Sequence, residues 1–363
     1  MKAANSLPLL LLSNRAWNDN LAKRLSDALS RPVYLFKHPR ELQEKAIQSR
    51  ISESQKISDK ISLQVRQMYE ENPYPRYQCA DHTPPQLSKP TAEFIALETT
   101  RALPQFSQEI ASPNSSPRVL IAGCGTGNQI ISASRYKNAQ ITAIDISKKS
   151  LAYASRKIHE YNMCNVQLQQ LDILDADQLA DVFDVIECSG VLHHMQDPAK
   201  GLAALNSKLK PGGYIKLGLY SQLARQHVSS ARELIHKLGI QSTAEGIRSF
   251  RKQIFDDDQH ELKPLSTLVN DFYSLSECRD LCFHVQEHQF TTQSLQNLLD
   301  SENLIFCGFM LPEPIKATYQ RQFPDDSEGI SLSNWGDFER QTPSTFQSMY
   351  QFWVYKPLQA PKP

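Results

Sequence analysis

The sequence has no surplus of either charge and no long apolar run. Among its 363 residues, lysine and arginine together number 39, and aspartate and glutamate also number 39. Without a basic excess we expect no nucleic-acid partner. The apolar run at residues 7–12 is interrupted by Pro8 and is too short for a signal sequence, and no other segment approaches the length of a membrane span. We therefore expect no membrane partner.

Paired cysteines and internal repeats are also missing. The seven cysteines are an odd number and are scattered along the chain, so they do not form a disulfide framework. This usage suits a reducing compartment, and we expect a cytoplasmic protein. No segment repeats with the period of about 34 residues that marks a tetratricopeptide array. The length leaves room for one large core domain and a smaller appendage.

Residues 118–128 and 141–145 combine a buried strand, a glycine turn and a distant acid. Residues 119–122 are apolar without alternation, as expected for a parallel strand covered on both faces. The glycines that follow allow a sharp turn and a close approach of the backbone to a ligand. Asp145 ends a second apolar strand about 20 residues later, the spacing at which a carboxylate can accept hydrogen bonds from both ribose hydroxyls. Together they predict a site for an adenosine-bearing ligand.

Further segments extend this pattern in a fixed order. Residues 166–171 read as a third strand, which places Asp172 where a carboxylate could accept from an adenine amino group. Residues 183–187 read as a fourth strand and are followed by Cys-Ser-Gly-Val-Leu-His-His-Met at 188–195. After an expected helix, Lys-Pro-Gly-Gly at 210–213 precedes a fifth strand at 214–219.

With this set of motifs the sequence resembles the class I S-adenosylmethionine-dependent methyltransferases over residues 68–356. The resemblance implies an α/β fold, a Rossmann-like seven-stranded and mostly parallel sheet that ends in an antiparallel hairpin. Dinucleotide-binding dehydrogenases share the glycine turn, but the final antiparallel strand expected at residues 346–355 is not typical of them. The implied cofactor is S-adenosyl-L-methionine, and the residues expected to bind it are Ala122, Gly123, Cys124, Gly125, Thr126, Gly127, Asp145, Ile146, Asp172, Ile173, Cys188, Ser189, Tyr69 and Tyr74.

A narrower resemblance begins upstream, at Met-Tyr-Glu-Glu-Asn-Pro-Tyr-Pro-Arg-Tyr in residues 68–77. The segment is similar to one that precedes the methyltransferase domain in a bacterial group, some of whose members also carry tetratricopeptide repeats. The same group resembles this chain at residues 271–280, 287–291, 323–326 and 349–353. We expect Tyr69 and Tyr74 to close over the cofactor, because aromatic faces attract a sulfonium.

These features divide the chain into three parts. Residues 1–60 form an N-terminal extension and linker, with an expected strand, helix and strand at 9–13, 18–29 and 33–36. Residues 61–117 form a helical and proline-rich segment that covers the active site. Residues 118–357 form the methyltransferase domain, interrupted by a helical lid insertion at 221–290 and a second insertion at 312–343.

Histidines are the candidates for acid–base chemistry. His193 and His194 follow the fourth strand at the edge where an open α/β sheet binds ligands, and either could take a proton from the acceptor. One of them could instead cap the turn while the other touches the cofactor. In the lid, we expect Arg279, His284 and His288 to face the acceptor. Methyl transfer from a sulfonium depends mainly on alignment and exclusion of water, so a dedicated base is optional.

A metal site is the weaker interpretation of the lid sequence. Cys278, Cys282, His284 and His288 have spacings that superficially match metal ligands, yet these are closer to helix-face repeats than to the short turns of structural zinc sites. We expect no metal. The acceptor is expected to be a small molecule; a protein side chain is the alternative, as is a regulator or scaffold that binds the cofactor without turnover.

Overall fold

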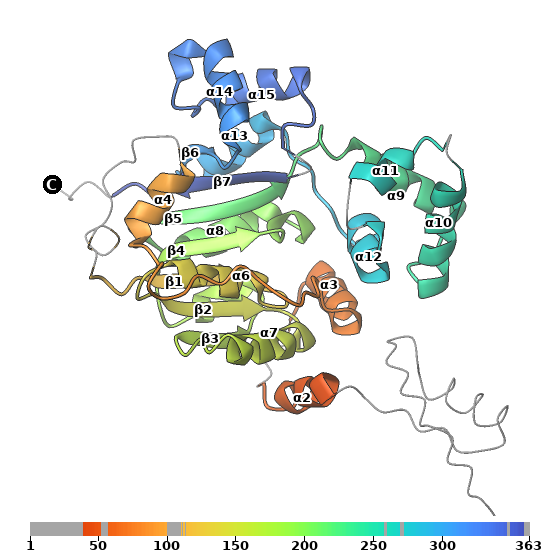
Figure 1. Ribbon diagram of the computed structural model, residues 1–363, viewed down its shortest axis with the longest axis horizontal. Helices are drawn as coiled ribbons and strands as arrows, with labels where there is room; N and C mark the ends of the chain where they lie inside the picture. Colours follow the sequence, from red (N-terminus) through yellow and green to blue (C-terminus); the bar gives the residue numbers. More distant parts are fainter. Residues whose placement is uncertain are drawn as a thin grey trace, which may run out of the picture.

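The computed structural model describes residues 39–51, 57–99, 110, 112, 114–257, 260–268, 272–346 and 349–358. The strand, helix and strand expected between residues 9 and 36 lie outside these ranges. A seven-stranded sheet forms the centre of the molecule (Figure 1), with strand order β3-β2-β1-β4-β5-β7-β6. The strands are β1 Arg118–Ala122, β2 Gln140–Asp145, β3 Val166–Gln170, β4 Phe183–Ser189, β5 Leu209–Tyr220, β6 Ile305–Phe309 and β7 Met349–Tyr355.

The pairing confirms the expected mostly parallel sheet with an antiparallel end. Strands β1 to β5 pair in parallel, whereas β7 runs antiparallel to both β5 and β6. The carboxyl ends of β1, β2 and β4 therefore meet at one edge, where an open α/β sheet binds its ligands. β5 begins at Leu209, earlier than expected, because Lys210 to Gly213 continue the strand instead of preceding it.

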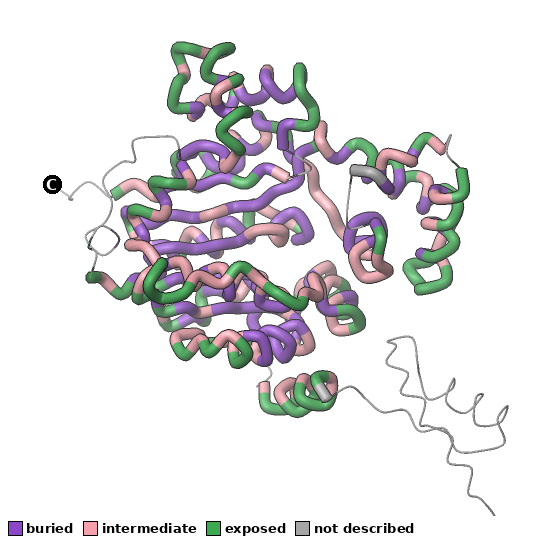
Figure 2. The backbone as a smooth tube through the Cα atoms, viewed as in Figure 1, coloured by how far each residue is buried: buried purple, intermediate pink, exposed green. Residues whose placement is uncertain are grey.

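Alternate residues of each strand enter two different cores. Leu120 and Ile186 pack with α8 (Pro198–Lys208), α13 (Thr292–Ser301) and α15 (Leu332–Gln341) on one face. Val119 and Val185 pack with α4 (Thr91–Glu98), α6 (Asn128–Ser132) and α7 (Lys148–Glu160) on the other. Figure 2 shows the strands buried along most of their length. Since both faces are covered, β1 is apolar without alternation from Val119 to Ala122, as the sequence indicated.

The chain leaves the sheet after β5 and forms a helical insertion with a core of its own. Its helices are α9 (Gln226–Leu238), α10 (Ala244–Asp256), α11 (Lys263–Leu268) and α12 (Leu275–Phe283). Phe250 and Phe272 are fully buried among them. These helices lie beyond the carboxyl ends of the strands (Figure 1), so the insertion faces the ligand edge of the sheet.

Two further segments complete the molecule. Before the sheet, α2 (Pro39–Gln48) contacts α7 through Glu44 and Arg156, whose Oε1 and Nε are 2.9 Å apart, and α3 (Lys60–Glu71) starts at the side-chain cap of Asp59. After β6, α14 (Glu313–Gln322) and α15 stand above β6 and β7 (Figure 1). Within the described residues, no helix is both long and apolar enough to cross a membrane.

Candidate functional site

The loop after β1 is tightly confined. Gly123, Gly125 and Gly127 have positive φ angles of 70°, 52° and 90°, a region that favours glycine. A Cβ on Gly125 would lie 2.9 Å from the carbonyl oxygen of Tyr74, and one on Gly123 would lie 2.5 Å from the side chain of Val191. The glycines therefore let other parts of the backbone approach the loop closely.

Asp145 ends β2 with its carboxylate directed at this loop. Its Oδ2 accepts a hydrogen bond from the backbone N–H of Gly125, and its Oδ1 accepts one from the N–H of Ser147, both at 2.8 Å. Burial raises the pKa of Asp145 to about 6, although these two amide donors oppose the rise. Two donors leave part of the accepting capacity of a carboxylate unused. Asp145 also lines the main cavity of the molecule. Its carboxylate can therefore accept hydrogen bonds from hydroxyl groups of a ligand.

The other expected cofactor residues divide into a lining group and a supporting group. Those lining the cavity with Asp145 are Gly123, Cys124, Gly125, Ile146, Asp172, Ile173, Ser189, Tyr69 and Tyr74. Those outside the lining are Ala122, Thr126, Gly127 and Cys188. Ala122 and Cys188 point into the sheet core, and Gly127 packs against Ala154 of α7. The supporting residues lie behind the lining group and shape the wall of the cavity.

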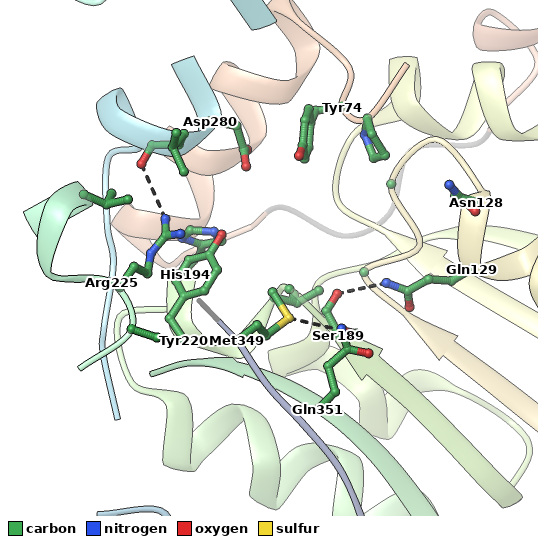
Figure 3. Close-up of a pocket in the computed structure, with 18 of the residues that line it drawn as sticks. Tyr74, Asn128, Gln129, Ser189, His194, Tyr220, Arg225, Asp280, Met349 and Gln351 are labelled. Atoms are coloured by element: carbon green, nitrogen blue, oxygen red, sulfur yellow. Dashed lines mark hydrogen bonds between the residues drawn. The ribbon is translucent and has the colours of Figure 1, made fainter. Parts of the chain in front are cut away.

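Residues 73–77, here called the strap, lie across the glycine loop. The Tyr77 hydroxyl donates to the carbonyl oxygen of Thr126 at 3.1 Å, and the Thr126 hydroxyl donates to the carbonyl oxygen of Pro75. Tyr153 of α7 donates to the carbonyl of Tyr77 at 2.6 Å. Figure 3 shows Tyr74 on the side of the pocket opposite Ser189. The strap thus forms a wall over the glycine loop.

Two of the candidate histidines share one hydrogen-bond acceptor. The rings of His194 and His284 stack with centroids 3.5 Å apart, and Nδ1 of each lies 2.7 and 2.8 Å, respectively, from the carbonyl oxygen of Gln286. Because a carbonyl oxygen can only accept, Nδ1 of His194 carries a proton and its Nε2 is left as a base, whereas Nδ1 of His284 also faces the backbone N–H of Gln286 at 3.3 Å. Burial lowers the pKa of both histidines well below the usual value, so both rings are neutral.

The four histidines differ in their access to the cavity. His194 lines it, whereas His193 is fully buried and stacks on Tyr220 with centroids 3.7 Å apart. His284 lies behind Tyr69, with its Nε2 3.3 Å from the Tyr69 hydroxyl. The orientation of His288 differs from the one we expected. Its Nε2 donates to the carbonyl oxygen of Met195 at 3.1 Å, and its backbone N–H donates to the carbonyl oxygen of His193 at 2.7 Å. His288 therefore ties the insertion to the turn after β4.

The insertion adds an ion pair that sequence patterns did not indicate. The Arg225 guanidinium donates to both carboxylate oxygens of Glu287, at 2.9 and 2.8 Å, and each side chain is 2% exposed. The same guanidinium lies 3.4 Å from the ring centroid of Tyr220. Glu287 follows Gln286 in the chain, so the ion pair between Arg225 and Glu287 holds the Gln286 carbonyl in place. This carbonyl orients His194 and His284.

A second contact links the insertion to the N-terminal helix. The Tyr69 hydroxyl of α3 donates to Oδ1 of Asp280 of α12 at 2.8 Å. Burial raises the pKa of Tyr69 well above its usual value, and the Asp280 carboxylate adds to the rise, so the phenol stays protonated. Figure 3 shows Asp280 directed toward Arg225 at one end of the pocket. Tyr69 and Asp280 together close this end of the cavity.

The cavity extends well beyond the glycine loop. Its volume is about 1330 Å³, and it is lined by the loops after β1, β2, β3 and β4, by α3 and the strap, by the insertion, and by residues from α14 to β7. Pockets for drug-sized ligands measure about 300–1,000 Å³. The cavity can therefore hold an adenosine-bearing ligand together with a second molecule.

The remaining lid residues have structural partners. Arg279 donates to Glu71 of α3 at 2.7 Å and to Ser242 at 3.1 Å, and it is absent from the cavity lining, in contrast to the acceptor-facing position we expected. α12 ends at Phe283, so the four cysteine and histidine residues expected on one helix face do not share a helix. Among the described residues, no three histidine, cysteine, aspartate or glutamate side chains are grouped as metal ligands.

Known proteins are similar in sequence to parts of this chain. Residues 113–275 match a family described as Methyltransferase domain. An uncharacterized protein of Synechococcus sp. is 33% identical over 275 residues, which cover 72% of this chain and 63% of the relative. The mitochondrial ubiquinone biosynthesis O-methyltransferase of Schizosaccharomyces pombe is 28% identical over 180 residues, which cover 49% of this chain and 62% of the relative. The chain thus spans less than two thirds of either relative.

A solved structure shares the fold. PKMT2 from Rickettsia typhi aligns with a TM-score of 0.53 and 20% sequence identity, over 78% of this chain and 55% of that one. Taken with the strand order, this likeness shows that the chain has a Rossmann-like fold, and the match to the methyltransferase-domain family covers residues 113–275 of it.

Proposed function

We propose that this protein binds S-adenosylmethionine and transfers its methyl group to an acceptor held beside the insertion. The observation that carries the proposal is the continuity of one cavity, which runs from Asp145 and the glycine loop to His194, Tyr220 and Asp280. PKMT2 from Rickettsia typhi has also been solved in complex with AdoHcy, at 19% identity and a TM-score of 0.52. The proposed cofactor end and a polar end thus share one cavity.

The residues present fit this cofactor. Asp145 can accept from the ribose hydroxyls, Asp172 can accept from the adenine amino group, and the narrow glycine loop permits close backbone contact. Tyr69 and Tyr74 contribute aromatic surface suited to a positively charged sulfur. S-adenosylmethionine supplies a methyl group on an activated leaving group, so the protein needs chiefly to align the acceptor and exclude water.

We further propose that His194 is the base when the acceptor must lose a proton. Its Nδ1–H is fixed by the Gln286 carbonyl, it is neutral, and its side chain lines the cavity. His193 lacks this access because Tyr220 covers its ring. His284 positions Tyr69 beside the acceptor. Removing a base of this kind lowers turnover by about 10²-fold or more and leaves cofactor binding nearly unchanged.

The proposal extends to the acceptor and to the chain's organisation. A cavity bounded by α3, the insertion and residues near β7 favours a small-molecule acceptor over a protein side chain. The contacts of the strap support the proposal that this protein belongs to the bacterial group with the Asn-Pro-Tyr-Pro-Arg segment. In this proposal the segment covers the active site. The separate core of α9 to α12 supports a lid at residues 221–290 within a domain that spans 118–357, with 312–343 as a second insertion.

Calorimetry and labelling test the function directly. The wild type is titrated with S-adenosylhomocysteine and with NAD⁺, and we expect it to bind the former and not the latter. S-adenosylmethionine with a trideuterated methyl group is then incubated with cell extract, and label is sought in the small-molecule and protein fractions. Label in small molecules, strongly reduced with His194→Gln, is the expected result. Label in protein alone would favour the protein methyltransferase, and cofactor binding without label would favour a scaffold.

A further inference from the structure

One end of the cavity is built by the second insertion. Pro314, Ile315 and Thr318 of α14 line it, together with Phe338 of α15, Thr342, Ser344 and Thr345. We call this end the outer arm. In Figure 1, α14 and α15 stand above β7, apart from helices α9 to α12. The outer arm therefore lies in a different part of the cavity wall from the ionisable residues of the lid.

The outer arm offers uncharged surface. None of the described lining residues between 314 and 351 is charged. The Thr318 hydroxyl donates to the carbonyl oxygen of Pro314 at 2.8 Å, and the Thr345 hydroxyl donates to that of Thr342 at 2.6 Å. Two of the four hydroxyl groups in the arm thus donate to the backbone, and Pro314, Ile315 and Phe338 supply carbon surface. An uncharged group can pack there, whereas a charged group would meet no charged partner among these lining residues.

The opposite end of the cavity is lined by charged and polar side chains. Arg225, Asp280 and His194 line it, and the Tyr69 hydroxyl lies among them. Polar groups confined to one end of an otherwise apolar pocket fix the orientation of a ligand. The two ends thus differ in the part of an acceptor that each can hold.

We propose that the outer arm is a binding subsite for an uncharged, largely apolar part of the acceptor, such as an aromatic ring or a short alkyl chain. The nucleophile at the other end of the acceptor then faces His194 and Tyr69. This inference rests on the proposed methyl transfer for the identity of its ligand. It makes the second insertion a determinant of specificity, because α14 and α15 set the length and width of the arm.

Two matched fluorescent probes test the arm without knowledge of the acceptor. N-phenyl-1-naphthylamine is neutral, whereas 8-anilinonaphthalene-1-sulfonate has the same rings and a negative charge. Each is titrated into the full chain saturated with S-adenosylhomocysteine. We expect one neutral probe per chain, bound about tenfold more tightly than the anion. Ile315→Trp and Thr318→Trp should weaken the neutral probe about tenfold by filling the arm. Gln320→Trp, on the same helix but outside the lining, should leave it unchanged.

The outcomes separate the subsite from the proposed function. Equal binding of both probes, or neutral-probe binding that both wall variants leave intact, overturns the subsite. Lack of binding by S-adenosylhomocysteine overturns the proposed function, and the probe titration on the protein alone still reports on the arm. Thr318 is exposed, so Thr318→Trp carries the test if melting curves show that Ile315→Trp does not fold.

Discussion

The buried carboxylate of Asp145 predicts opposite pH dependences for cofactor binding and for stability. Burial raises its pKa from 3.8 to about 6, although two backbone amides bind it and Glu70 of α3 adds to the rise. The ribose hydroxyls bind the ionised form. At pH 5 about one molecule in eleven has Asp145 ionised, so the Kd for S-adenosylhomocysteine should be about tenfold higher than at pH 7.

Stability should change in the other direction. In the unfolded chain Asp145 ionises near pH 4, whereas in the fold it keeps its proton until about pH 6. Between these values the unfolded state binds fewer protons, so the contribution of Asp145 to the free energy of unfolding falls as pH rises, by about 2–3 kcal/mol in total. The contribution is fully present below about pH 4 and lost above about pH 6.

Asp145→Asn isolates both effects, because asparagine has the same shape as aspartate and has no carboxyl group that titrates. Calorimetry between pH 5 and pH 7 should give a constant Kd for the variant, apart from an offset for its weaker hydrogen bonds. Urea unfolding over pH 4 to 7 should give a stability difference between wild type and variant that shifts with pH in favour of the variant. Identical pH profiles for the two proteins would refute both the raised pKa and the ribose assignment.

Other parts of the site give three further predictions. Amide exchange in residues 69–77 should slow when S-adenosylhomocysteine binds, because the strap covers the cofactor; equal protection in both states would make it a structural brace. Arg225→Ala should lower the free energy of unfolding by about 3–5 kcal/mol in urea melts, since it leaves Glu287 charged and buried, and a loss below about 1 kcal/mol would contradict this. Once an acceptor is known, His284→Ala should lower kcat about tenfold and leave the cofactor affinity unchanged. His288→Ala should change only the melting temperature. A normal kcat in His284→Ala would argue against a positioning role for His284.

The centre of the sheet was predictable from the sequence because β1 is a continuous apolar run. Its residues 119–122 alternate between two buried faces, so neither face needed polar residues, and the glycine loop and Asp145 mark the ends of β1 and β2. The same pattern located Asp172 and Ser189 in the cavity wall. These features are local, and each depends on a few consecutive residues.

Long-range contacts were not predictable in the same way. Tyr69 and Asp280 are 211 residues apart in the sequence, and Arg225 and Glu287 are 62 residues apart, yet each pair is hydrogen-bonded. No local sequence pattern predicts either pair. His288 was expected to face the acceptor as part of the lid insertion that follows β5. The helix ends at Phe283, and the extended backbone that follows turns His288 toward Met195.

The placement of the cavity wall along the chain limits what sequence comparison can reveal. The matched methyltransferase domain begins at residue 113 and ends at residue 275. Asp145 and His194 fall inside this span, whereas Tyr69, Asp280 and the whole outer arm fall outside it. Under the proposed function, the matched span therefore holds the proposed ribose acceptor and the proposed base, and the outer part of the acceptor wall lies beyond it. Proteins that match over this span alone can differ in that outer part, so the match is a poor guide to the acceptor.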